Sequence, residues 1–179
     1  MKTLIRILPL FLVLTFGISS CGYRNPYIYT GPSKTIYITK WKNRTSELQL
    51  NNAIYKSLLE WYQKAGSFKI TRKKEGADFI LAGEIHEIKL PSLTFNADND
   101  ASKVKVELTV RYILKDLTQD KVLFEQSKTT LTEDYDVSTS SAVTADNEQE
   151  ALDEIIDTMS ETIYLKTLKK LMRMQALTQ

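Results

Sequence analysis

The strictest pattern in this chain is the alternation of apolar and polar residues from position 103 to position 114. Apolar side chains occupy every second position of this stretch: Val104, Val106, Leu108, Val110, Tyr112 and Leu114. A period of two sends successive side chains to opposite faces of a β-strand, so the pattern predicts a half-buried strand with one polar face. Residues 116–120 then predict a turn, and residues 121–132 are expected to return as the hairpin partner.

Three further strands are predicted from short β-type runs bounded by turn residues, at residues 34–41, 68–71 and 78–90. In the third run the apolar phase shifts between Ile85 and Ile88, which indicates either a β-bulge or a strand that is covered on both faces. The alternation of the first run places Tyr37 and Trp41 on the face opposite to its isoleucines. These two rings would form a partly aromatic contact surface on the outer side of the sheet.

Two helices are predicted from apolar residues at helical spacing. The first follows the opening strand, starts with a capping box made by Ser46 and Gln49, and ends at Gly66; its stripe is Leu50, Ile54, Leu58, Trp61 and Ala65. The second is expected to run from about residue 146 to Arg173, with acidic residues at its start and basic residues at its end. Residues 133–146 are predicted to be a polar loop. From Glu148 to Arg173 this helix would be about 39 Å long at 1.5 Å per residue, longer than the sheet, so its end is expected to overhang.

The resulting order is β-α-β-β-β-β-α, which predicts one α+β domain over residues 34–175. A right-handed crossover makes the first two strands parallel, and the remaining connections are expected to be antiparallel hairpins. The predicted architecture is a two-layer sandwich, in which a mixed four- to five-stranded sheet carries two helices packed on one face. A chain of 179 residues can bury a core of this size without disulfides or metal.

The composition argues against several classes of function. The chain has one cysteine and one histidine, which excludes an intrachain disulfide and disfavours a zinc site or a catalytic Cys–His pair. The glycines are scattered, so no phosphate-binding loop is predicted. The histidine, His86, falls within a predicted strand and is expected to be a structural or surface residue. We therefore predict a protein that is not an enzyme and that needs no cofactor and no metal.

The first twenty residues are predicted to be a lipoprotein signal peptide. Two basic residues precede an apolar run at 7–16, which is followed by Ile18-Ser19-Ser20-Cys21. This is the bacterial lipobox pattern, because cleavage needs small residues and the new N-terminal cysteine carries the acyl chains, palmitate among them. Cys21 is thus the predicted lipidation site, and residues 21–33 are the predicted tether. Gly22, in place of an aspartate, favours the outer membrane.

The removal of residues 1–20 has a consequence for charge. Lys2 and Arg6 are lost with the signal peptide, so the 24 basic residues fall to 22 and equal the 22 acidic ones. A neutral mature chain has no general attraction for nucleic acid, and any anion binding must be local.

An ordered set of short segments resembles the lipopolysaccharide-assembly lipoprotein family LptE. These segments are Cys21-Gly22-Tyr23, residues 36–40 with Asn43-Arg44-Thr45, residues 77–85, 104–112 and 122–125 with Tyr135, and Asp146-Asn147-Glu148-Gln149. The resemblance implies an outer-membrane lipoprotein on the periplasmic side. Such a protein plugs and helps assemble the LptD β-barrel translocon, and it assists the delivery of lipopolysaccharide to the outer leaflet.

Members of that family carry basic residues, thought to meet lipid A phosphates, where this chain has Asn96 and Ala145. The nearby cations here are Lys103, Lys105 and Lys128. Lys103 and Lys105 share a strand face about 6.6 Å apart, which suits a phosphate clamp as well as a solvated face. An alternative function is that of an outer-membrane lipoprotein that activates a peptidoglycan synthase. Such a lipoprotein needs a long stalk to reach the cell wall, and residues 22–33 are too short to form one.

Overall fold

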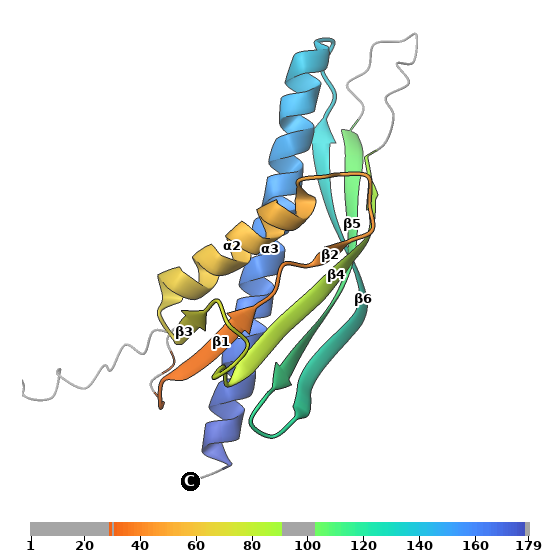
Figure 1. The fold of residues 1–179 in the computed structure, drawn as a ribbon. Helices are drawn as coiled ribbons and strands as arrows, with labels where there is room; N and C mark the ends of the chain where they lie inside the picture. Colours follow the sequence, from red (N-terminus) through yellow and green to blue (C-terminus); the bar gives the residue numbers. More distant parts are fainter. Residues whose placement is uncertain (1–28, 30, 91–102, 178–179) are drawn as a thin grey trace, which may run out of the picture.

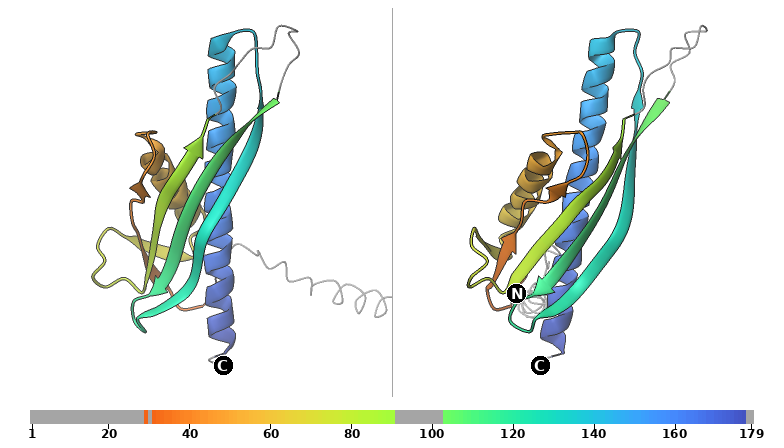
Figure 2. Two further views of the ribbon diagram at one scale, coloured as in Figure 1. Left: turned by 90° about the vertical axis from the view of Figure 1, so that its right-hand side faces the viewer. Right: turned by 45° about the vertical axis from the view of Figure 1, so that its right-hand side comes forward.

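One sheet and two helices make up the part of the chain that the computed structural model describes, namely residues 29, 31–90 and 103–177. The elements follow the order of Figure 1: β1 (Lys34–Ile38), β2 (Lys42–Asn43), α2 (Leu50–Ala65), β3 (Phe68–Thr71), β4 (Phe79–Lys89), β5 (Lys103–Asp116), β6 (Lys121–Asp136) and α3 (Ser141–Ala176). Both helices lie on the same side of the sheet (Figure 2). The predicted α+β two-layer architecture is therefore confirmed.

The sheet is mixed, with the strand order β3-β1-β4-β5-β6 and with β2 paired to β4. As predicted, β1 and β3 are parallel, and β4, β5 and β6 form antiparallel pairs. The expectation of a hairpin between β3 and β4 was wrong, because β1 lies between them and is parallel to both. β1 takes this central place since both of its isoleucines are fully buried, whereas the four-residue β3 is an edge strand.

The side of the sheet on which Trp41 lies also differs from the prediction. Its ring is 2% exposed and packs on the helix-covered side of Gly83, not on the outer face. The cause is the register, since Ile38 pairs with Leu81 but Lys42 pairs with Glu84. Four residues on one strand therefore match three on its neighbour, and the extra residue inverts the alternation after Ile38. Tyr37, which precedes this irregularity, is half-buried on the outer face as expected.

Helix α2 begins and packs somewhat differently from the prediction. Its buried stripe is Leu50, Ile54, Leu58 and Tyr62. Trp61 lies beside this stripe, and its indole Nε1 donates a hydrogen bond to Asp157 on α3 at 2.7 Å. Ser46 does not cap the helix, because Asn43 organises the preceding turn by accepting the N–H of Thr45 and donating to the carbonyl of Glu47. Gly66 ends the helix in the left-handed conformation with φ 64°, as predicted.

Helix α3 is longer than the sequence indicated. β6 continues to Asp136 and the helix begins at Ser141, so the predicted loop at 133–146 is reduced to a short turn. Thr144 fixes this turn, because its hydroxyl accepts the N–H of Ser138 and donates to the carbonyl of the same residue. With 36 residues the helix is about 54 Å long. Its C-terminal end continues past the β5–β6 turn, as the predicted overhang required (Figures 1 and 2).

An aromatic cluster joins the two helices to the edge of the sheet. Tyr62 of α2 meets Tyr164 of α3 edge-on at 5.2 Å between ring centroids, and Phe68 of β3 lies 5.4 Å from Tyr62. The hydroxyl of Tyr62 is paired with Thr167 at 2.7 Å, so a buried polar group is satisfied. Burial raises the pKa of the Tyr62 phenol, which stays neutral at physiological pH.

Candidate binding face

The face of the sheet turned away from the helices is a ladder of charged and polar side chains. Its rows follow from the strand register, which sets Glu84 opposite Arg111, Lys89 opposite Glu107, and Lys105 opposite Asp134. Lys89 and Glu107 form an ion pair at 2.8 Å, and Lys105 lies 3.9 Å from Asp134. The hydrogen bond from Lys89 holds the pKa of Glu107 below its usual range. Most charges on this face are thus matched across neighbouring strands.

The centre of the face is a buried carboxylate between two arginines, a group that we call the arginine cluster: Arg44, Glu84 and Arg111. Glu84 is only 8% exposed. Arg44 donates a hydrogen bond from Nε to one of its oxygens, and Arg111 Nε lies 3.5 Å from the other. The hydrogen bond from Arg44 is the main reason that the pKa of Glu84 is lowered; burial opposes it, and the charges of Arg44, His86 and Arg111 reinforce it.

The position of Arg44 depends on packing on the other side of the sheet. Trp41 lies flat against Gly83 and stacks with Tyr112, 6.0 Å away with 18° between the planes. Any side chain at position 83 would have to displace the Trp41 ring, because a Cβ there would come within 2.4 Å of it. The chain leaves this anchor through β2, and the Arg44 N–H then donates to the carbonyl of Ile85 at 3.0 Å. The guanidinium is thereby placed over Glu84.

A shallow pocket of about 330 Å³ adjoins the arginine cluster, and it is lined by His86, Glu87, Thr109, Ser127 and Lys128. It forms where both ladders are irregular. The register shifts between Ile85 and Glu87 in β4, as the sequence predicted, and between Val110 and Tyr112 along the β5–β6 pair. Thr109 forms its floor, since it is buried and its hydroxyl is paired with that of Thr130 at 3.0 Å.

The arginine cluster and this pocket together have a local excess of positive charge. Arg44, Arg111 and Lys128 supply three permanent cations against the two carboxylates of Glu84 and Glu87. The side chains of Arg44 and Arg111 are 53% and 54% exposed, so their outer N–H groups face solvent. A guanidinium pinned on one side by a carboxylate offers its remaining donors in a fixed direction, which suits phosphate or carboxylate oxygens.

The three lysines predicted to bind lipopolysaccharide do not form one site. Lys105 of β5 lies opposite Asp134 of β6. Lys128 is six residues before Asp134 on β6, which places it about 20 Å away along the strand. Lys128 is exposed and belongs to the pocket beside the arginine cluster. Lys103 opens β5, and its side chain lies outside the described part of the structure, as do Cys21 and Asn96. The proposed Lys103–Lys105 clamp is therefore untested.

The sequence missed the arginine cluster because its members come from three separate segments. Alternation had placed Arg111 on the polar face, but only the register of β4 against β5 brings Glu84 opposite it. Arg44 had been assigned to a turn. Glu84 itself was the one signal of a buried ion pair in the sequence, because it is a charged residue among the apolar residues of a long strand.

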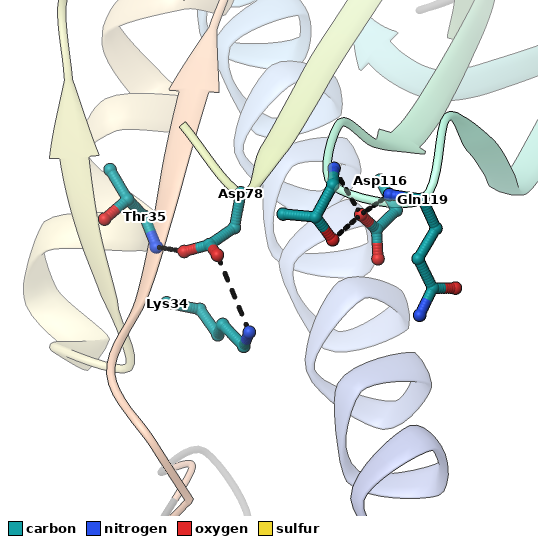
Figure 3. Close-up of polar contacts among 6 residues, drawn as sticks. Lys34, Thr35, Asp78, Asp116 and Gln119 are labelled. Carbon is teal, nitrogen blue, oxygen red and sulfur yellow. Dashed lines mark hydrogen bonds and ion pairs between the residues drawn. The ribbon is translucent and has the colours of Figure 1, made fainter. Parts of the chain in front are cut away.

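Two further carboxylates, at the end of the sheet where β4 begins and β5 ends, are structural (Figure 3). Asp78 accepts the N–H of Thr35 at 2.7 Å and lies 3.5 Å from the ammonium of Lys34, which ties β4 to β1. Asp116 begins the β5–β6 turn by accepting the N–H groups of Thr118 and Gln119. Burial acts to raise the pKa of Asp116, but these hydrogen bonds outweigh it and the pKa is lowered.

Two kinds of feature are absent from the described residues: a metal-binding group of side chains and a helix that could span a membrane. Among residues 29, 31–90 and 103–177, no three side chains of His, Cys, Asp or Glu are grouped so as to hold a metal ion. Neither α2 nor α3 has an apolar stretch long enough to span a bilayer.

Comparison with known protein families identifies the family of this chain. The sequence model of the lipopolysaccharide-assembly family LptE matches residues 33–167. This range includes all the strands, α2 and most of α3. The chain belongs to the LptE family. The family consists of non-enzymatic lipopolysaccharide-assembly lipoproteins, so this LptE-family chain is a lipoprotein of lipopolysaccharide assembly and not an enzyme. No curated protein sequence matches it.

Solved structures agree with the LptE-family fold. A Xanthomonas campestris protein is similar with a TM-score of 0.55 at 14% identity, over 81% of this chain and 90% of that one. The rare lipoprotein B of Shewanella oneidensis is similar with a TM-score of 0.53 at 9% identity, over 79% of this chain and 98% of that one. At such low identities these similarities establish the shared fold.

Proposed function

We propose that this LptE-family lipoprotein is anchored to the outer membrane by acylated Cys21, on the periplasmic side. It plugs and helps assemble an LptD-type β-barrel translocon, and it assists the delivery of lipopolysaccharide to the outer leaflet. The match to the LptE family over residues 33–167 is the observation that carries this proposal. The predicted lipobox at residues 18–21 supports the anchor, because a tether raises the local concentration of the domain near a barrel in the same membrane.

The open face of the sheet supports a role inside a polar enclosure. It is a flat array of matched ion pairs, and the arginine cluster at its centre keeps exposed donors. The lumen of an outer-membrane barrel is polar, and a plug within it needs hydrogen-bonding side chains on a rigid support. The two-layer fold supplies that support, since the other face of the sheet is buried under α2 and α3.

The experiment that tests this function is affinity purification of the acylated protein from detergent-solubilised outer membrane. We expect a β-barrel protein to copurify at close to one copy per copy of the lipoprotein. Recovery of a penicillin-binding protein in place of a barrel would support the activation of a peptidoglycan synthase and would reject the plug. A Cys21→Ser variant, which cannot be acylated, should recover much less barrel from the same cells.

We further propose that Lys103, Lys105 and Lys128 contact the phosphates of lipopolysaccharide, and that Lys128 acts together with Arg111. The register places Arg111 opposite the irregular segment of β6 that contains Lys128, so their charges can act on one phosphate group. Lys105 has Asp134 as a competing partner and is expected to contribute less. Direct binding is measured with purified lipopolysaccharide and single lysine variants.

Lys128→Glu is expected to weaken lipopolysaccharide binding more than Lys105→Glu does. Lys56→Glu is the matched control, because Lys56 is equally a surface lysine but lies on α2, on the other layer of the molecule. Unchanged affinity in a Lys103→Glu/Lys105→Glu/Lys128→Glu variant would reject direct contact by these residues, while leaving the barrel interaction to be judged by copurification.

A further inference from the structure

The charges of helix α3 are separated along its length. Its first part carries seven carboxylates and no basic residue: Asp146, Glu148, Glu150, Asp153, Glu154, Asp157 and Glu161. Its last part carries four basic residues and no carboxylate: Lys166, Lys169, Lys170 and Arg173. The helix dipole acts only on the first and last turns, and because α3 begins at Ser141 its first turn holds none of the carboxylates that were expected to complement the dipole, while its last turn holds only Arg173. From Asp146 to Arg173 the bias covers about 40 Å of helix, so α3 has an acidic end and a basic end.

The acidic end is reinforced by β6. A pocket of about 210 Å³ between the end of β6 and the first half of α3 is lined by Glu133, Asp134, Asp136, Glu150 and Glu154, together with neighbouring residues. Within it, Tyr135 donates its hydroxyl to Glu148 at 2.8 Å. Burial raises the pKa of that phenol to about 12, so the tyrosine adds no charge.

The basic end is the end at which the tether enters the fold. The N–H of Tyr29 donates to Ser67 Oγ at 3.0 Å, and the same oxygen is 2.8 Å from the hydroxyl of Tyr164 on α3. Gly31 lies against the last turns of the helix, since a Cβ on it would be 2.7 Å from Gln175 Oε1. Tyr29 follows Cys21 by only eight positions, so the chain between their Cα atoms can span at most about 28 Å.

Another cation, Lys121, lies at the same end of the sheet, where the carboxylates of Asp78 and Asp116 are already engaged. Lys121 opens β6 opposite Asp116, which is buried and accepts hydrogen bonds within its own turn. Asp78 is bound by Thr35 and Lys34 (Figure 3). The basic residues at the end of α3 therefore meet little opposing charge from the sheet beside them.

The last turns of α3 also present apolar surface between these cations. A surface groove of about 470 Å³ is lined by Leu165, Leu168 and Met172, with Lys169, Arg173 and Ala176 beside them. Apolar side chains flanked by lysine and arginine are the composition of segments that lie at a membrane interface, where the cations meet lipid phosphates.

We propose that, while the lipoprotein is not held in a barrel, the C-terminal end of α3 packs against the anionic lipid surface to which the chain is tethered, so that the acidic end points away from the bilayer. The inference rests on the proposed acylation of Cys21 and goes beyond the proposed plug, since it assigns an orientation and a lipid contact. Lys169, Lys170 and Arg173 make the contact. Each such cation contributes about a fivefold factor to attraction at an anionic surface at moderate salt.

The orientation can be measured with the acylated full-length protein in vesicles. Cys21 is the only cysteine and is blocked by acylation, so Ala176→Cys and Ala142→Cys each introduce one free thiol for a fluorophore, at opposite ends of α3. The vesicles consist of phosphatidylcholine with a headgroup-labelled quenching lipid, and one set also contains phosphatidylglycerol at about one lipid in three. That amount gives the negative surface potential of an anionic leaflet. We expect phosphatidylglycerol to increase quenching at position 176 and to leave position 142 unquenched.

Charge variants then identify the residues responsible. Lys169→Gln/Lys170→Gln/Arg173→Gln should abolish the phosphatidylglycerol-dependent quenching at position 176. Lys40→Gln/Lys42→Gln/Lys56→Gln is the control, because it removes the same net charge from exposed positions away from that end and should leave the quenching intact.

Equal quenching at both positions, or quenching at position 176 that ignores both the anionic lipid and the triple variant, would overturn the proposal. Loss of barrel copurification by the triple variant without any change in quenching would also overturn it, since these cations would then face a protein. Failure of the proposed function is seen separately, as loss of the barrel from the unmodified protein.

Discussion

The substitution of Gly83 by alanine tests how the binding face is supported. In most strands this change stabilises a protein by about 0.4–1 kcal/mol, because alanine has fewer unfolded conformations to lose. At position 83 the new Cβ would lie 2.4, 2.5 and 2.8 Å from three atoms of the Trp41 ring. Carbon atoms in contact prefer about 3.5 Å or more, so the ring has to move by roughly 1 Å.

The ring has little room for such a movement. Trp41 is 2% exposed and is stacked on Tyr112, which in turn meets Phe124 edge-on at 6.2 Å. Overpacking of a core of this kind costs about 1–3 kcal/mol. We therefore expect Gly83→Ala to lower the free energy of unfolding by about 2 kcal/mol. Because the chain runs from Trp41 directly to Arg44, the same change should also displace Arg44 from Glu84.

A double-mutant cycle measured by urea denaturation isolates this effect. Trp41→Ala alone should cost about 3–5 kcal/mol through the cavity that it leaves. In that background the alanine at position 83 has no ring to meet, so Gly83→Ala should become neutral or stabilising by up to about 1 kcal/mol. An equal cost of Gly83→Ala in both backgrounds would refute the contact as the reason for the glycine.

Three other changes have defined outcomes. Glu84→Gln should destabilise the protein at neutral pH and make its free energy of unfolding depend less on pH in the acid range. The folded-state pKa of Glu84 is lowered, so the stability that its charge contributes is complete above the unfolded pKa of about 4.3 and is lost as the pH falls through the folded pKa. An unchanged acid-unfolding profile in the variant would contradict this. Tyr62→Phe should cost about 1 kcal/mol in urea unfolding, because Thr167 keeps its bond to the Ile163 carbonyl; a cost above 3 kcal/mol would mean that the site repacks. Gly66→Ala should cost about 1 kcal/mol from the left-handed backbone alone, since no atom lies within 4 Å of the added Cβ, and a neutral result would show that the helix end relaxes.

Local patterns in the sequence were sufficient for most of the elements. The alternation after Lys103 predicted β5, and the phase shift after Ile85 predicted the bulge at His86, because both depend only on the period of side chains along one strand. Gly66 ended α2 because the left-handed conformation favours glycine. These features need no knowledge of which strands are neighbours.

What the sequence did not reveal depends on contacts between distant segments. The central place of β1, the inversion of Trp41 and the arginine cluster all follow from strand order and register, which no single segment specifies. The early start of α3 is a tertiary effect as well. Its first turns contain serine and threonine, which have low helix propensity, but Thr144 is buried and tied to Ser138.

The central claim is that the chain serves lipopolysaccharide delivery as a lipid-anchored partner of a barrel. The most direct measurement is the amount of lipopolysaccharide at the cell surface after depletion of the protein, quantified on intact cells. We predict a progressive loss of surface lipopolysaccharide that is restored by the wild-type chain and not by Cys21→Ser. Undiminished surface lipopolysaccharide in fully depleted, growing cells would contradict the claim.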